Sequence, residues 1–164
     1  MVTYSLDTYN QKDLKEIVRL YKETIQAVNQ KDYSYQQIKQ WLNSTPSDEQ
    51  WHDILCSEHT LIARQQTKIL GFGSLSASGS IDYLFVDKSW IGYGIGKVLA
   101  DALITQANST GAHHLSVHAS ITAKPFFESL GFTVFEPKNN YRNGVLLLNY
   151  VMVLPLDNKK DTLI

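Results

Sequence analysis

The sequence predicts an α/β or α+β fold with one mixed sheet, and three observations support this. The first third of the chain shows helical periodicity, the middle then changes to a period of two, and strands and helices alternate afterwards. The predicted element order, βααβββαβαββ, requires both antiparallel and parallel pairing. At 164 residues, 43% of them hydrophobic, we expect one domain spanning residues 1–164.

The first elements are marked by alternation and by capping residues. Val2–Leu6 alternates apolar and polar side chains and predicts a strand, after which Asn10 can cap a helix. The capping-box pattern Ser34–Gln37 predicts the start of a second helix, and Ser47–Gln50 repeats the pattern before Trp51. The residues that share the apolar face of the first helix are Leu14, Ile17, Val18, Tyr21 and Ile25.

The rest of the chain alternates between the two periods. The predicted strands are Thr60–Arg64, Ile69–Leu75, Ile81–Val86, His114–His118, Thr133–Phe135 and Leu146–Leu154. A long helix with an apolar face begins near Ile95 and ends before Gly111, and a short helix spans Thr122–Leu130. Asn139–Gly144 predicts a turn before the last strand, and Arg142 within it could contact an acidic substrate or a cofactor.

Composition excludes several classes of protein. Fifteen basic and sixteen acidic residues give a net charge of −1, which is not typical of a nucleic-acid-binding surface. Neither a signal peptide nor a membrane span is predicted, so we expect a soluble, cytoplasmic protein. Cys56 is the only cysteine, which excludes an internal disulfide and a cysteine-built zinc site, and as a nucleophile it has no identifiable partner. His114 and His118 lie too far apart on one strand to share a metal, so no metal site is expected.

Three glycines precede the long helix. Gly92, Gly94 and Gly96, followed by Lys97, lie where a strand leads into a helix. The first backbone N–H groups of a helix have no partner within it, and glycines allow an anion to approach them closely. The segment therefore indicates a phosphate-binding turn, although a simple tight turn is the alternative. It matches neither the Walker loop nor the dinucleotide-binding fingerprint.

Two motifs in this region resemble those of the GNAT superfamily, the acetyl-CoA-dependent N-acetyltransferases. Val86–Asp87 followed by Ile91–Gly96 is similar to the family's strand end and R/Q-x-x-G-x-G/A motif. Ser120–Phe132, with Ala123, Phe127 and Gly131, is similar to its N-x-x-A-x-x-x-Y-x-x-x-G-F motif. Further similarity, in the segments 33–41 and 119–128, points to the bacterial YafP-like branch. The resemblance implies a single mixed, mostly antiparallel sheet flanked by helices.

The resemblance also implies a transferase that moves an acetyl group from acetyl-CoA to a primary amine of an unidentified small molecule or protein. The residues it places at the co-substrate are Leu84, Phe85, Val86, Ile91, Gly92, Tyr93, Gly94, Ile95, Gly96, Lys97, Ser120, Lys124 and Phe127. The chain departs from the family at three of these. Ile91 replaces Arg or Gln, Ser120 replaces Asn, and Phe127 replaces the Tyr that usually protonates the leaving thiolate.

A general base is useful, because an amine of pKa about 10.4 is almost fully protonated at pH 7. Asp82, at the start of the Ile81–Val86 strand, is the first candidate, and alternation places it on the face of Leu84 and Val86. His118 is a second candidate. Ser120, Tyr141 or water could protonate the thiolate. The alternative for each side chain is a purely structural role.

Two other functions remain open. The first is an acyl-CoA-binding module without catalysis, which the departures at Phe127 and Ile91 would suit. The second is a structural or dimerisation domain, although such a domain would have no use for the two motifs. The apolar last strand could pair with a second subunit to form a homodimer. Four aromatic residues near the first helices pack in the core or line an acceptor pocket: Tyr33, Tyr35, Trp41 and Trp51.

Overall fold

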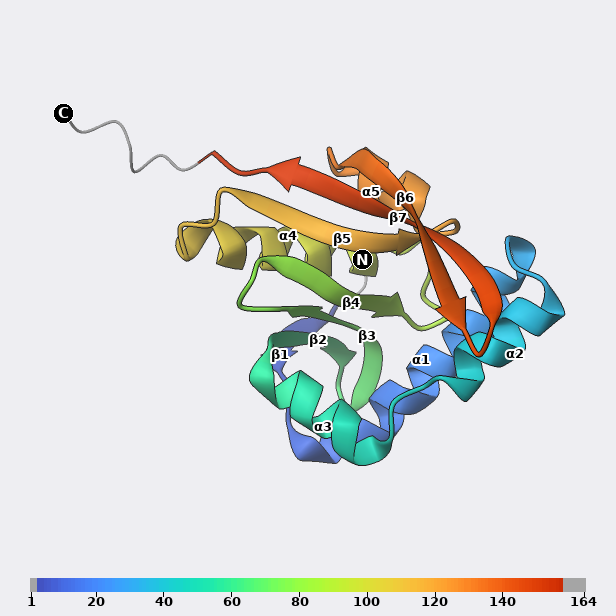
Figure 1. Cartoon of the computed structure of the whole chain (residues 1–164). Helices are drawn as coiled ribbons and strands as arrows, with labels where there is room; N and C mark the ends of the chain where they lie inside the picture. Colours follow the sequence, from blue (N-terminus) through green and yellow to red (C-terminus); the bar gives the residue numbers. More distant parts are fainter. Residues whose placement is uncertain (1–2, 158–164) are drawn as a thin grey trace.

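The computed structural model describes residues 3–157 and contains one seven-stranded sheet (Figure 1). The strands lie in the order β1-β2-β3-β4-β5-β7-β6, and every neighbouring pair is antiparallel except the parallel pair β4 and β5. The sheet is therefore mixed and mostly antiparallel, as the sequence predicts. The strand bounds are β1 Ser5–Thr8, β2 His59–Gln65, β3 Lys68–Leu75, β4 Ser80–Val86, β5 His114–Ser120, β6 Thr133–Arg142 and β7 Val145–Pro155.

Five α-helices accompany the sheet within residues 3–157, together with the short 3₁₀ turns η1 (Gln11–Asp13) and η2 (Asn29–Lys31). The predicted capping residues are confirmed. The Asn10 side chain accepts from the Lys12 N–H at the start of η1, and Ser34 and Ser47 form complete capping boxes. The helix bounds are α1 Leu14–Val28, α2 Tyr35–Asn43, α3 Asp48–Ser57, α4 Ile95–Ser109 and α5 Lys124–Ser129.

Several predicted bounds need correction. The first strand was placed at Val2–Leu6, but β1 is Ser5–Thr8, and residues 1–2 lie outside the described part. The predicted element order omits α3, although its capping box is present in the sequence. The segment Asn139–Gly144 is not a turn throughout, because β6 continues to Arg142. Pairing with β7 outweighs the turn preference of the two asparagines, and Pro137 is tolerated because β6 is an edge strand.

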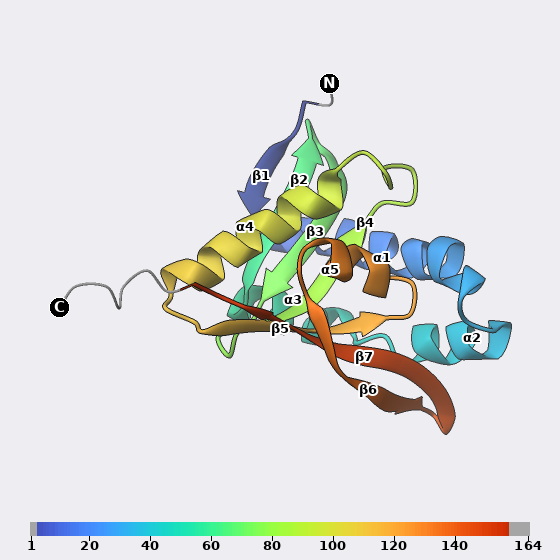
Figure 2. The same ribbon diagram turned by 90° about the horizontal axis from the view of Figure 1, so that it is seen from above.

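Helices cover both faces of the sheet (Figures 1 and 2). On one face, α1, α2 and α3 bury a cluster centred on the fully buried Trp51, which packs against Tyr21, Phe72 and Tyr83. On the other face, α4 and α5 cover β3, β5 and β7. The sheet is thus buried on both sides, which explains why β3 carries almost no polar side chain.

The strands β4 and β5 pair over only two positions, Ser80 with Ser116 and Ile81 with Val117. At this point β4 also contains a bulge. Ser74 pairs with Tyr83 and Leu75 with Ile81, so that Asp82 has no partner across the ladder. A bulge bends its strand and interrupts the alternation of side chains. Beyond Ile81 the two strands diverge, and a space opens in the middle of the sheet.

The hairpin of β6 and β7 extends past the end of β5 toward α2 (Figure 1). Its two-residue turn has positive φ angles at Asn143 and Gly144, as a type I′ turn requires. Three side chains on or beside α2 hold the hairpin in place. Tyr33 and Gln37 donate to the carbonyls of Leu148 and Leu146, and the side chain of Asn143 donates to Gln40.

A hydrogen bond between α1 and β4 gives a testable prediction about this arrangement. The buried Thr24 hydroxyl donates to the carbonyl of Val86 at 2.9 Å. We expect Thr24→Val to lower the free energy of unfolding by about 1–3 kcal/mol, because the carbonyl loses its partner. The control is Thr105→Val, since Thr105 is exposed and bonds only within α4. Urea unfolding should show a change within about 0.5 kcal/mol for the control, and an equal loss in both variants would contradict the prediction.

Candidate active site

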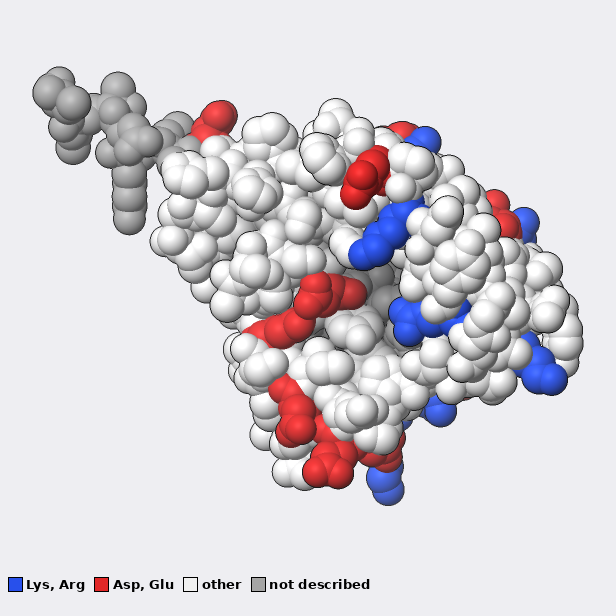
Figure 3. Space-filling model, viewed as in Figure 1, with Lys and Arg blue, Asp and Glu red and all other residues white. Residues whose placement is uncertain are grey.

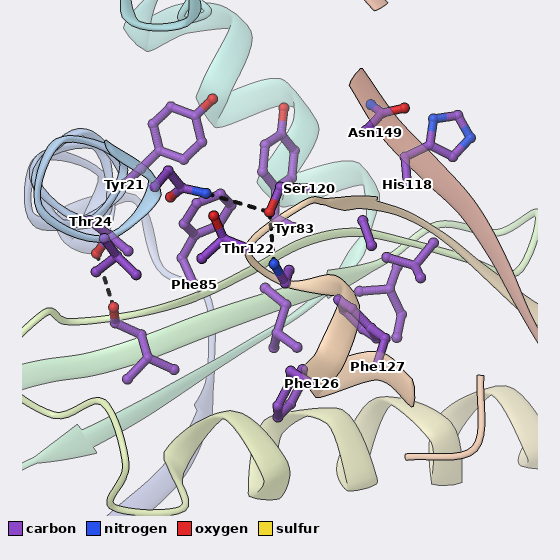
Figure 4. Close-up of a pocket in the computed structure, with 18 of the residues that line it drawn as sticks. Tyr21, Thr24, Tyr83, Phe85, His118, Ser120, Thr122, Phe126, Phe127 and Asn149 are labelled. Carbon is purple, nitrogen blue, oxygen red and sulfur yellow. Dashed lines mark hydrogen bonds between the residues drawn. The ribbon is translucent and has the colours of Figure 1, made fainter. Parts of the chain in front are cut away.

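A cavity of about 890 Å³ occupies the space where β4 and β5 diverge. Its walls come from α1, β4, β5, the start of α4, and the β6–β7 hairpin. Figure 4 shows how side chains from these elements converge on it, including Tyr21, Tyr83, His118 and Ser120. Four buried polar atoms that belong to lining residues have no hydrogen-bond partner among the described residues: Glu58 Oε2, Thr122 Oγ1, Arg142 Nε and Asn149 Oδ1. A cavity with such atoms is suited to a polar ligand.

The glycine segment lies at one end of this cavity and opens α4, as predicted. Gly92 and Gly94 have φ angles of +86° and +84°, a backbone region that side chains rarely adopt, and no atom would contact a Cβ at either position. Gly94 is the N-cap and provides no side chain to the first N–H groups of α4. These groups therefore face the cavity without a side-chain cap, which is the geometry expected for binding an anion. The predicted residues that line this end are Ile91, Gly92, Gly94, Ile95, Gly96 and Lys97.

The edge of β4 that faces β5 is the second feature of the cavity. From Asp82 to Val86 this edge has no strand partner, because β5 pairs only with Ser80 and Ile81. Leu84, Phe85 and Val86, which the resemblance places at the co-substrate, all line the cavity. A ligand that extends along β4 can therefore bond to its backbone as a missing strand would. Thr24 already occupies the carbonyl of Val86 (Figure 4).

Ser120 lies at the end of β5, where its hydroxyl accepts two hydrogen bonds (Figure 4). The N–H of Ala123 donates at 3.0 Å and the side chain of Asn29 at 3.4 Å. Both acceptor positions of the oxygen are thus engaged, and its own hydrogen is left to donate. Ser120 is therefore a hydrogen-bond donor toward the cavity, in the position of the family's asparagine.

The other predicted co-substrate residues differ in their placement. Phe127 lines the cavity (Figure 4), although it is only 3% exposed and packs edge-on against Phe126 and Phe132 in the core beneath α5. Tyr93 and Lys124 do not line the cavity. The Tyr93 ring packs against Trp90 on the exposed side of the turn, and the Lys124 ammonium pairs with Glu128 at 3.1 Å.

Asp82 lines the cavity, but its orientation differs from the prediction. Strand alternation places it on the face of Leu84 and Val86, which pack under α4, whereas the bulge interrupts that alternation. Asp82 lies instead beside Glu58, the residue that follows α3. Burial raises the pKa of Glu58 to about 7, and the neighbouring Asp82 carboxyl adds to this rise while Ser74 opposes it. Glu58 and Asp82 thus form a carboxyl pair in which Glu58 keeps its proton to a higher pH than an isolated glutamate does.

His118 also lines the cavity and is exposed on β5. Partial burial lowers its pKa from 6.5, as does the charge of Lys138, while Asp82 acts in the opposite direction. The imidazole is therefore mostly neutral at pH 7 and able to accept a proton. The structure brings the three predicted catalytic residues, Asp82, His118 and Ser120, into one cavity.

Sequence reasoning did not identify Glu58, Thr24 or Asn29 as site residues. Glu58 had a weak signal, since an acidic residue at the C-terminal end of a helix opposes the helix dipole. Thr24 and Asn29 had none, because Thr24 lies in α1 and Asn29 directly after it, where periodicity predicts only packing. Cys56 also needs correction, since its sulfur lies 3.6 Å from His52 Nε2. Neither residue lines the cavity.

Comparison with known proteins identifies the family. Residues 29–154 match the family model described as an acetyltransferase (GNAT) domain. The chain belongs to the GNAT acetyltransferases. It is 28% identical to the N-acetyltransferase YafP of Escherichia coli K12, over 93% of this chain and 96% of that protein.

Two solved structures support this assignment. A GCN5-related N-acetyltransferase from Rhodopseudomonas palustris superposes with a TM-score of 0.90 and 31% identity, over 95% of this GNAT chain and 98% of the other. The PaiA N-acetyltransferase of Thermoplasma acidophilum, solved with coenzyme A, has a TM-score of 0.77 and 16% identity, over 94% of this chain and 100% of the other. The second likeness shows the fold alone.

No helix within residues 3–157 is long and apolar enough to cross a bilayer. No group of three or more His, Cys, Asp or Glu side chains in the same range is arranged to hold a metal ion.

The glycine turn gives the second prediction. We expect Gly94→Asp to weaken CoA binding at least about tenfold, or about 1.4 kcal/mol, because it places a negative charge at the N-terminus of α4. Gly111→Asp is a matched control, since Gly111 has a φ of +80°, equally open surroundings, and a position beyond the other end of α4. Calorimetric titration with CoA should separate the two variants. Equal affinity in both, with both folded, would remove the turn from the binding site.

Proposed function

We propose that this protein is an acetyl-CoA-dependent N-acetyltransferase that acetylates a primary amine. The observation that carries the proposal is the convergence of three features on one cavity. These are an uncapped helix N-terminus behind Gly94, an open β4 edge, and the carboxyl pair of Glu58 and Asp82. The first two suit the phosphates and the extended arm of coenzyme A, with which the PaiA relative was solved.

The carboxyl pair supplies the base in this proposal. The amine must be neutral to attack the thioester carbonyl, and its proton passes to Glu58, whose pKa of about 7 suits proton transfer at neutral pH. Asp82 acts by keeping that pKa high. The new C–N bond forms as the C–S bond breaks, and coenzyme A leaves as a thiolate.

Ser120 supports the departure of the thiolate. Its free hydroxyl hydrogen can bond to the sulfur, and a thiol of pKa about 8.5 needs little further help at pH 7. This explains how the reaction can proceed with Phe127 in place of the family's tyrosine.

The first experiment separates an enzyme from a CoA-binding module without catalysis. We expect CoA to raise the melting temperature, and acetyl-CoA to be consumed in the presence of an amine panel, as measured with a thiol reagent. A thermal shift without turnover of any amine would favour the binding module. If CoA causes no thermal shift and no amine is acetylated, both the enzyme and the binding module are rejected.

The pH dependence of the rate tests the roles within the carboxyl pair. We expect kcat/KM to rise with pH through a midpoint near 7, as Glu58 loses its proton. Glu58→Gln should lower the rate about 10²–10⁴-fold at pH 7, because it removes the base. Asp82→Asn should keep activity and move the midpoint to lower pH, because Asp82 raises the pKa of Glu58.

Two outcomes would contradict this assignment. A loss of rate at every pH in Asp82→Asn, with little effect of Glu58→Gln, would make Asp82 the base. If His118→Gln abolishes the pH dependence of kcat/KM near pH 7, His118 is the general base. Asp53→Asn is the matched control, since Asp53 is exposed on α3 and does not line the cavity.

A further inference from the structure

The charged side chains of the cavity are separated by sign. Glu58 and Asp82 lie on the side of α3 and β4, whereas Lys138 and Arg142 come from β6 in the hairpin. Figure 3 shows this face of the molecule, with acidic side chains on one side of a hollow and basic side chains on the other. The acidic side suits an amine, and the basic side needs a separate explanation.

Within the described part of the chain, no carboxylate pairs with the charge of Arg142. Among residues 3–157 the side chains of Arg142 and Lys138 form no ion pair, and the buried Nε of Arg142 has no hydrogen-bond acceptor. By contrast, Arg64 and Arg19 both form ion pairs with carboxylates. A buried guanidinium N–H without an acceptor is costly, and a ligand carboxylate would satisfy it with paired hydrogen bonds.

Neighbouring side chains show that the two charges face the same space. Tyr83 lines the same cavity as Glu58, Asp82 and Arg142. Burial most of all, with the neighbouring Tyr21, Glu58 and Asp82, raises the pKa of Tyr83 to about 12, and the charge of Arg142 opposes this rise. Tyr21 lies beside Arg142 and accepts a hydrogen bond from Trp41 Nε1 at 3.1 Å, so its own hydroxyl hydrogen can be donated. Tyr21 and Arg142 both line the cavity and can present hydrogen-bond donors to it.

The position of Arg142 is fixed by the fold. It is the last residue of β6, directly before the type I′ turn, and it pairs with Val145 across the hairpin. The bond from Asn143 to Gln40 and the bond from Gln37 to the Leu146 carbonyl hold this turn against α2. The guanidinium is therefore held above the cavity rather than on a free loop.

We propose that the acceptor is a small amino-carboxylate, with its amine at Glu58 and Asp82 and its carboxylate at Arg142. This proposal rests on the proposed N-acetyltransferase activity and specifies its substrate class. Arg142 and Lys138 repel a polyamine, whereas a simple alkylamine leaves Arg142 unpaired. Tyr21, Tyr83 and Trp41 line the same cavity and add aromatic surface to its wall.

The test uses acceptor pairs that differ by one carboxylate. L-Phenylalanine is compared with phenethylamine, and γ-aminobutyrate with propylamine, each at saturating acetyl-CoA. We expect the carboxylate to raise kcat/KM at least about tenfold in one or both pairs, mainly through KM. Arg142→Gln should bring that ratio close to one, and Arg142→Lys should retain part of it, because Lys keeps the charge without the paired N–H groups.

Arg19→Gln is the matched control, since Arg19 lies on the exposed side of α1 and pairs with Glu16 and Glu23. It should keep the full preference, and a CoA thermal shift checks that each variant folds. Equal rates within both pairs, a preference for spermidine, or a ratio that survives Arg142→Gln would overturn the substrate class. Failure of the transferase function itself would appear differently, as CoA binding without turnover of any acceptor.

Discussion

The separation of β4 from β5 is the constraint on which the rest of the site depends. Two strands that pair over only two positions leave five residues of β4 with an unpaired edge in the middle of a buried sheet. Unpaired backbone groups inside a protein are costly, so this gap persists only because the surrounding packing holds it open. The bulge at Asp82 bends β4, and α1 is held to its end through the Thr24 bond to Val86.

The same gap explains the electrostatics of the cavity. By interrupting the alternation of β4, the bulge places Asp82 beside Glu58 rather than under α4. Partial burial raises the pKa of Glu58 to about 7, and the neighbouring Asp82 carboxyl adds to the rise. The bulge at Asp82 thus contributes both to the opening of the cavity and to the raised pKa of Glu58, which lines it.

Much of the fold could be predicted because its signals are local. The capping boxes at Ser34 and Ser47 each depend on side chains three residues apart, and the glycines before α4 follow from backbone geometry. The motif around Ser120 could be placed at the site because it too is contiguous. The β6 strand was predicted too short, since asparagines favour turns unless a neighbouring strand offers hydrogen bonds, and β7 does so here.

The sequence by itself determined the helices, most strands, the glycine turn and the likeness to the GNAT family, because periodicity and contiguous motifs carry these. Only the tertiary structure decided the partners of the charged groups. Glu58, Asp82 and Arg142 are distant in sequence and meet in one cavity through sheet order, a bulge and a hairpin held by α2. A pKa and an unpaired guanidinium depend on what surrounds a group in space, and neighbouring residues along the chain do not supply that information.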